Sequence, residues 1–423
     1  MIDNDCESLQ KKRGDLYEKQ WINKWIDAVN RFPLPEKIKY QQLSCSPNIT
    51  MEYYLKNQDK PWNLYQLLMS NPNVTVDIGL LFESKLKIIK RDFIEDFMQS
   101  HNGVSSYEYH TDSLFLTENK LIEIIWQGVS GGKVTMDEIL QYSNKPWSWR
   151  TLSKNSSIKM TDVLNHPDLP WDWMVLSMNP SITIDDVINN SDKPWNWYFV
   201  SKMQGLTLEK MLENPTLPWR WNAFCDSLDY NNVNVPFEFV LDNLDKPWNM
   251  HVLSRHRSIT LADILQYPLF NWNWEFISEN PSITMNDVNE HPELSWYWPG
   301  VTRNPSITME DISNNVDIPW DWSYIAFNPN ITPEFILNNK DKPFNWDFLS
   351  LNENVDIDFV LSNLDKSWSY SYFIFGNDLI GSKKKYIKEK ENELKENMEN
   401  LNIIQEKNKN IPQEIFRTIS DYF

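Results

Sequence analysis

Residues 179–202 read NPSITIDDVINNSDKPWNWYFVSK, and this stretch decides the fold because it recurs along most of the chain. The aromatic residue after its D-K-P turn recurs at Trp147, Trp171, Trp195, Trp219, Trp248, Trp272, Trp296, Trp320, Phe344 and Trp368. Eight of the nine intervals in this series are 24 residues, and the interval from Trp219 to Trp248 is 29. In most copies a second aromatic residue follows two positions later. A fixed period of this length indicates repeated supersecondary units that stack on one another.

The first half of the unit predicts a short helix, helix A. Pro180 ends the preceding helix, and Thr183 then acts as an N-cap with Asp186 three residues later, which completes a capping box. The same pair recurs as Thr135/Glu138, Thr260/Asp263, Thr284/Asp287 and Thr308/Asp311. Apolar pairs such as Val187-Ile188 follow the cap, and an Asn/Asp-rich stretch ends the helix after about two turns.

The second half predicts another short helix, helix B, which opens at the proline of P-W and carries both aromatic residues. An aliphatic residue near its end recurs as Leu152, Leu176, Val200, Leu253, Ile277 and Leu349. The W-x-W alternation also has the period of a β-strand. The recurring N-caps and P-W helix starts favour helix over strand.

Such short helices are marginal alone, since isolated helices need roughly 12–15 residues. We therefore predict an all-α fold, an α-solenoid of ~24-residue two-helix repeats with helical N- and C-terminal extensions. The tryptophans suit a core between repeats, because they keep one register beside aliphatic residues. Two tryptophans at i and i+2 point to different faces of a helix, so we expect one of each pair to be partly exposed. An exposed indole ladder for ligands is the alternative.

Five segments follow from this register. Residues 1–40 are predicted as a helical N-terminal cap with Trp21 and Trp25 on one face, and residues 41–79 as the first repeats. Residues 80–126 are predicted as a helical insertion, interpreted either as a partner-specific element or as an enlarged repeat. Residues 127–372 hold the tandem repeats, and the five extra residues within 225–234 predict a kink or a protruding loop. Residues 373–423 are predicted as a charged helical tail.

That tail leaves the oligomeric state open. Tyr386, Leu394, Met398 and Leu401 fall on one helical stripe among lysines and glutamates. The segment is interpreted as a surface helix or cap, with a coiled-coil dimer as the alternative. The run Lys383-Lys384-Lys385 is too short to indicate a nucleic-acid patch.

Composition restricts the partners. The chain of 423 residues has a formal net charge of −19, which disfavours nucleic acid because an acidic surface repels phosphate backbones. Its three cysteines, Cys6, Cys45 and Cys225, are odd in number and widely spaced, which indicates a reducing compartment. The N-terminal stretch has no apolar signal core, and no apolar window is long enough to span a membrane.

No catalytic constellation stands out. The chain has no H-E-x-x-H, C-x-x-C, phosphate-loop or nucleophile-elbow motif. His166 and His291 occupy one repeat slot, which favours a structural role, and His251 and His256 are five residues apart, too far to share a helical face as metal ligands. Gly128, Gly131 and Gly132 lie close together without a phosphate motif around them. We therefore predict no catalytic, cofactor-binding or metal residues, no cofactor and no enzymatic activity, and the binding residues stay undefined.

The repeat resembles the uncharacterised tandem-repeat proteins of mimivirus-like giant viruses, which carry N-P-x-I-T followed by D-K-P-W-x-W many times. Here the phrase appears as residues 179–183 with 192–197, and its first half recurs at residues 304–308 and 328–332. The resemblance covers most of residues 44–372 and omits both ends and the 80–126 segment. It implies a giant-virus origin, and hence a host cytoplasm or virion location, but no activity.

The sequence therefore predicts a non-enzymatic repeat scaffold for protein–protein interaction, with a protein partner of unknown identity. Long regular arrays offer extended binding surfaces, which supports this prediction. The alternative is a binder of single-stranded nucleic acid or glycan that uses exposed tryptophan faces. A third hypothesis, an enzyme with its site in residues 80–126, is the weakest.

Overall fold

The computed structural model describes residues 2–101, 117–228, 235–375, 383, 385–393 and 395–396. The described residues form 25 α-helices and one short 3-10 helix, and their only strand-like pairing is an isolated bridge between Thr75 and Lys133. The all-α prediction is confirmed. The chain divides into two compact units, residues 35–331 and residues 1–34 with 332–423, and each is described by itself.

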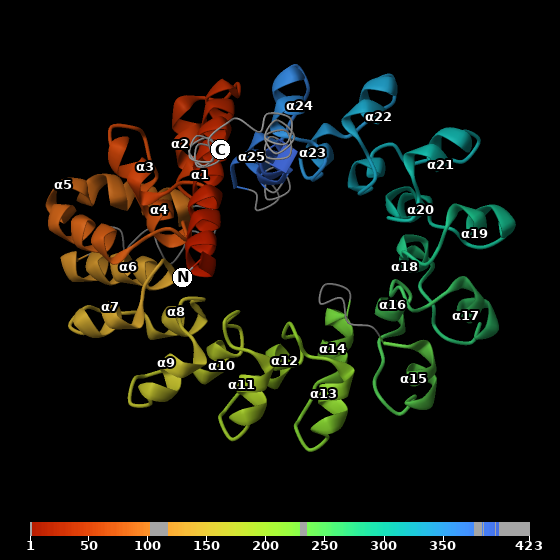
Figure 1. Cartoon of the computed structure of the whole chain (residues 1–423), viewed down its shortest axis with the longest axis horizontal. Coiled ribbons are helices and arrows are strands. Elements are labelled where there is room, and N and C mark those ends of the chain that lie inside the picture. Colours follow the sequence, from red (N-terminus) through yellow and green to blue (C-terminus); the bar gives the residue numbers. More distant parts are fainter. Residues whose placement is uncertain are drawn as a thin grey trace, which may run out of the picture. The chain divides into compact units, whose positions relative to one another are not determined.

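In unit 35–331 short helices of two kinds alternate along the chain, and Figure 1 shows them as two rows. The helices A are α3 Met51–Lys56, α5 Val76–His101, α7 Met136–Gln141, α9 Met160–Asn165, α11 Ile184–Asn189, α13 Leu208–Glu213, α15 Phe237–Asp242, α17 Leu261–Gln266, α19 Met285–Glu290 and α21 Met309–Asn314. The helices B are α2 Glu36–Leu43, α4 Leu64–Ser70, α6 Glu118–Gly131, α8 Trp149–Lys154, α10 Trp173–Leu176, α12 Trp197–Val200, α14 Trp221–Ser227, α16 Met250–Leu253, α18 Trp274–Glu279, α20 Trp298–Arg303 and the 3-10 helix η2 Tyr324–Phe327.

Each regular helix A begins at the predicted cap. The Thr183 hydroxyl accepts a hydrogen bond from the Asp186 N–H at 3.1 Å, and the Asp186 carboxylate accepts from the Thr183 N–H at 2.8 Å. All five predicted capping boxes are present. Because this pair satisfies two otherwise unpaired donors, a helix of only six residues has a defined start.

Helix B does not begin at the proline of P-W, so that prediction is wrong. The helix begins at the second aromatic residue, and the residue between the two aromatics is its N-cap. Ser148, Asp172 and Asn273 illustrate this, since each side chain accepts from a backbone N–H of the first turn. The first tryptophan lies before the helix, and the indole N–H of Trp195 donates to the Asn190 carbonyl at 2.8 Å, which closes the turn after helix A.

The core lies between helices A and B of successive units. The aliphatic residue before each threonine cap is almost fully buried, as are the aliphatic residues in mid-helix A and near the end of helix B. Ile182, Ile259, Ile283, Ile307 and Ile331 illustrate the first position. Burying such a side chain stabilises by about 1.5–3 kcal/mol, so each unit depends on its neighbours for stability.

The predicted 80–126 segment comprises most of α5 and the first part of α6, and both helices extend beyond its limits. The end of α6 makes the contacts of a regular helix B. Trp126 packs edge-to-face on Trp147 at 4.9 Å between ring centroids, and the Ser130 hydroxyl accepts from the Ser148 N–H at 3.0 Å. These contacts favour the interpretation of this segment as an enlarged repeat. Residues 102–116, between the two helices, lie outside the described residues.

The other unit contains α1 Ile2–Arg31, α22 Pro333–Asn338, α23 Trp346–Leu349, α24 Ile357–Ser362 and α25 Tyr370–Phe375. Helix α1 packs on the last repeats of its own unit, where the buried Trp25 indole donates to the Phe373 carbonyl at 2.9 Å. Residues 1–40 were predicted to cap the first repeats. Those repeats belong to the unit of residues 35–331, so this role stays a prediction.

The C-terminal tail is described only in part. Lys385 pairs with Asp356 at 3.0 Å, and Lys383 pairs with Glu18, so these lysines contact acids of their own unit. Leu394, Met398 and Leu401 of the predicted stripe lie outside the described side chains, as do residues 229–234 of the predicted kink.

Candidate functional site

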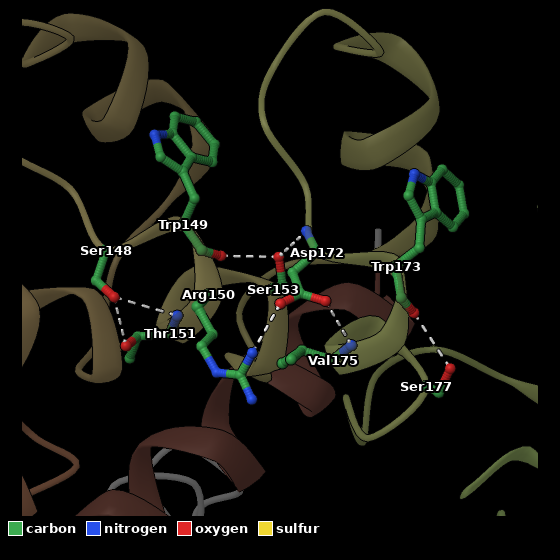
Figure 2. A network of polar contacts seen from close by, with 9 residues as sticks. All are labelled: Ser148, Trp149, Arg150, Thr151, Ser153, Asp172, Trp173, Val175 and Ser177. Atoms are coloured by element: carbon green, nitrogen blue, oxygen red, sulfur yellow. Dashed lines mark hydrogen bonds and ion pairs between the residues drawn. The ribbon is translucent and has the colours of Figure 1, made fainter. Parts of the chain in front are cut away.

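One polar link joins most helices B to the next through a serine, and Figure 2 shows the copy at Ser153. The Ser153 hydroxyl donates to the Trp149 carbonyl at 2.8 Å and accepts from the Asp172 N–H at 2.9 Å. The Asp172 carboxylate accepts from the Val175 N–H at 3.1 Å, and it also pairs with Arg150 at 3.1 Å. Ser153 therefore fixes the N-cap of one helix against the last turn of the preceding helix.

The same link recurs in nearly every described repeat. A hydroxyl accepts from the N–H of the next helix-B cap, 19 residues later, at Ser44, Ser177, Ser201, Ser254, Ser278, Thr302 and Ser350. Ser130 makes the same link to a cap 18 residues later. The sequence analysis missed this position, although a serine or threonine four residues after the second aromatic is visible in phase.

A second link is a ladder of buried asparagines, which are the first residues of N-P-S-I-T. The Nδ2 atom of Asn280 lies 3.0, 2.9 and 3.0 Å from the carbonyl oxygens of Ser254, His256 and Ile259 in the preceding repeat. Its Oδ1 atom accepts from the Ser282 N–H at 2.8 Å. Equivalent bonds are made by Asn71, Asn155, Asn179, Asn304 and Asn328. A carboxamide suits this position because it combines donors and an acceptor in one small group.

The tryptophans form a third link. The second tryptophan of one repeat packs edge-to-face on the first tryptophan of the next, as in the pair Trp173–Trp195, with 5.1 Å between centroids and 85° between planes. Where the turn carries lysine, its ammonium group lies over the preceding second tryptophan, and Lys193 is 5.9 Å from the Trp173 ring centroid. The second tryptophan is half-buried, as expected for one of each pair, but neighbouring side chains contact its ring.

The described histidines have local structural partners. The His166 ring lies 3.0 Å from the Asp162 carbonyl of its own helix, and the His291 ring lies 3.2 Å from Glu293. His256 is buried and occupies the asparagine position of its repeat, where its Nδ1 atom lies 2.7 Å from the Ser258 hydroxyl. In the part of the chain that the structure describes, no group of His, Cys, Asp and Glu side chains is arranged to hold a metal ion.

The thiols and glycines also have packing roles. Burial raises the pKa of the Cys45 and Cys225 thiols to about 11, so both are protonated at neutral pH and weak as nucleophiles. An added Cβ at Gly128 would meet the Leu68 carbonyl oxygen at 2.7 Å, and one at Gly132 would meet the Val74 carbonyl oxygen at 2.2 Å. These two glycines allow the α6 segment to approach neighbouring backbone closely.

The outward positions differ between the two helix rows. The fifth residue of helix A is an exposed leucine in several repeats, at Leu55, Leu140, Leu164, Leu212 and Leu265. In two repeats of this unit the position holds Asn289 or Ser313 instead. Acidic residues surround this row, because the capping boxes and turns supply aspartate and glutamate in every regular unit. On the helix-B row, Met174, Met178 and Tyr198 form an exposed apolar group.

A cavity of about 570 Å³ lies beside that apolar group. It occurs in the repeat where Met203 occupies the asparagine position and where Gly205 has a positive φ of 84°. Met178, Phe199, Lys202 and Met203 line it, together with residues of the segments 177–180 and 182–185. In this repeat the departure from the ladder coincides with a cavity.

A second hollow of about 450 Å³ lies among α2, α3 and α5. Its half-buried Asp96 accepts from the Leu64 N–H at 2.6 Å, and burial raises the pKa of this carboxyl to about 6. Lys37, Lys60 and Lys85 also line the hollow, so it mixes charges of both signs.

The chain has no match among known protein families, curated proteins or solved structures. Among the described helices, none combines the length and apolar character that crossing a bilayer requires. The function must therefore be argued from the geometry of the repeats.

Proposed function

We propose that the chain is an α-solenoid that serves as a non-enzymatic scaffold and binds another protein. The observation that supports this proposal is that each repeat uses separate sets of residues for joining its neighbours and for facing outward. Serine, asparagine and tryptophan at fixed positions join successive units mainly through backbone groups. The outward positions of both helices vary from repeat to repeat. A regular framework with variable outward side chains is the arrangement that repeat proteins use for recognition.

The alternative, a nucleic-acid or glycan binder with exposed indoles, has less support. Stacking on bases or sugars requires an open ring face. The Trp173 and Trp221 rings each pack edge-to-face with the first tryptophan of the next repeat. The ammonium group of Lys193 or Lys246 lies over the face of each of these rings. The acidic character of helix A adds repulsion toward phosphate.

We also propose a giant-virus origin, and hence a location in the cytoplasm of the amoeba host or in the virion. The support is the N-P-x-I-T and D-K-P-W-x-W phrases alone.

The experiment uses the full chain with a photo-crosslinking amino acid at one of two exposed positions. Leu164 presents the probe on the helix-A row, and Met174 presents it on the helix-B row. Each protein is irradiated in lysates of amoebae, uninfected or infected with a mimivirus-like virus, at several salt concentrations. We expect discrete protein adducts from one row, which excess unlabelled chain suppresses, and few from the other row, which is the matched control.

If neither row yields a competed adduct under any condition, the scaffold proposal is wrong. Titration with single-stranded oligonucleotides and oligosaccharides is the companion measurement. A saturable change in tryptophan fluorescence would favour the alternative function.

A further inference from the structure

The Met203 repeat lacks the donor that closes the ladder elsewhere. In regular repeats one Nδ2 atom lies within hydrogen-bond distance of three carbonyl oxygens of the preceding unit. At the Met203 position those three oxygens belong to Ser177, Asn179 and Ile182. A thioether has no N–H to donate, so the side chain of Met203 cannot reproduce these bonds.

The three oxygens retain acceptor capacity. Among the described residues, the Asn179 carbonyl accepts from the Ile182 N–H at 3.1 Å, a bond that each regular unit also makes. No other protein donor in the described ranges reaches these three oxygens. Ser177, Asn179 and Ile182 all line the 570 Å³ cavity. Buried acceptors without a donor destabilise the fold, and a bound donor would recover that free energy.

The charges at the cavity select the kind of donor. Lys210 is paired with Asp185, and Lys202 lies 4.7 Å from the Tyr198 ring centroid and 3.9 Å from Asp226. Because an acid lies beside each ammonium group, the cavity has no excess charge of either sign that would favour an ionic ligand. A neutral group with two N–H donors, as on the regular asparagine, fits both the oxygens and this charge balance.

The apolar lining of the cavity indicates what kind of molecule would bear this donor group. Met178, Phe199 and Met203 line the cavity, and the exposed Met174 and Tyr198 continue the apolar surface outside it. Methionine-rich surfaces adapt to varied apolar side chains. The volume lies within the range of about 300–1,000 Å³ that is typical of ligand pockets.

We propose that this cavity binds an asparagine or glutamine side chain of a partner polypeptide. The partner's carboxamide NH₂ group takes the place of the missing ladder nitrogen and donates to the carbonyls of Ser177, Asn179 and Ile182. An adjacent apolar residue of the partner packs on Met178 and Phe199. This inference rests on the proposed scaffold function and assigns the chemistry of one contact within it.

The test compares full-length wild type with Met203→Asn, which supplies the missing donor from within the chain. The probes are immobilised nine-residue peptides with randomised flanks and a central Asn, Gln, Asp or Leu. We expect wild type to be retained at least tenfold more on Asn- or Gln-centred peptides than on Asp- or Leu-centred ones. Met203→Asn should lose that preference and should raise the thermal unfolding midpoint.

Two further variants are matched controls. Met203→Leu offers no donor and should keep the preference, and Met174→Asn adds a carboxamide outside the ladder and should keep it too. If Met203→Asn fails to fold by circular dichroism, Phe199→Trp narrows the same cavity and should abolish the preference.

A wild type without any preference for Asn or Gln overturns the inference, and so does a folded Met203→Asn protein that keeps it. The scaffold proposal fails separately, when neither helix row yields a competed adduct. A partner that crosslinks to wild type and Met203→Asn equally leaves the scaffold standing and refutes this contact.

Discussion

Replacing one ladder asparagine tests whether these buried amides hold the repeats together. Asn304 is fully buried, and its Nδ2 atom lies 3.0, 2.9 and 3.3 Å from the carbonyls of Ser278, Asn280 and Ile283. Its Oδ1 atom accepts from the Ser306 N–H at 2.8 Å. An NH₂ group has two hydrogens, so Asn304→Ala removes about two donor bonds and one acceptor bond. At about 1 kcal/mol each, we expect a loss of about 3 kcal/mol in the free energy of unfolding.

The measurement is urea unfolding, followed by both tryptophan fluorescence and circular dichroism because repeat arrays need not unfold in one step. Asn304→Asp keeps the shape but places a carboxylate against three carbonyl oxygens, so it should destabilise more than Asn304→Ala. Asn314→Ala, at an exposed position at the end of α21, is the matched control and should stay within about 0.5 kcal/mol of wild type. An Asn304→Ala protein as stable as this control, or an aspartate variant more stable than the alanine variant, would refute the ladder as a source of stability.

Three other outcomes follow from the described contacts. Ser153→Ala removes the bonds to the Trp149 carbonyl and the Asp172 N–H. It should lower the free energy of unfolding by about 1–2 kcal/mol, measured by urea unfolding. Ser153→Thr keeps the hydroxyl, as Thr302 does in its repeat, and should lower the free energy of unfolding less. Burial raises the pKa of Asp96 from 3.8 to about 6, so the folded chain binds this proton more tightly than the unfolded chain. The resulting stability is fully present below about pH 4 and is lost as pH rises through about 6; Asp96→Asn should flatten thermal midpoints over that window, and an unchanged slope contradicts the assignment. Cys225 is fully buried with a pKa raised to about 11, so peptide mass spectrometry should find it unmodified by iodoacetamide at pH 7.5 until urea unfolds the chain; rapid labelling in the native protein counts against its burial.

Local signals in the sequence predicted helix A well and helix B less well. The Thr183/Asp186 pair is sufficient to predict a helix start, because the cap residue and its partner lie within one turn of each other in the sequence. The proline before Trp195 misled the prediction of helix B, because proline is common at helix starts and also in extended turns. The Trp195 indole bond to the Asn190 carbonyl decides between them, and no window of sequence shows that bond.

The contacts between repeats were harder to predict, since they join residues 18 to 26 positions apart. The asparagine before Pro180 was given no role in the prediction, because its in-phase recurrence does not reveal which carbonyl groups it contacts. Trp126 was missed because its spacing to Trp149 is 23 residues, one short of the period. Its helix is also longer than a regular helix B, with α6 reaching from Glu118 to Gly131.

The two kinds of contact have different consequences for recognition. The linking serine and asparagine side chains bond to backbone groups of the neighbouring repeat. These bonds therefore do not depend on which side chains the neighbouring repeat carries at its outward positions. A repeat can therefore change its exposed side chains at little cost to stability. A change at a link position, in contrast, exposes backbone acceptors that the fold normally satisfies. Met203 and His256 are both such changes, and at Met203 the changed position also lies beside a cavity. We therefore propose that sequence variation in the Met203 repeat alters the chemistry offered to a partner as well as the shape. If recognition is concentrated anywhere in this array, the physical argument places it where a link position has changed and a cavity has opened beside it.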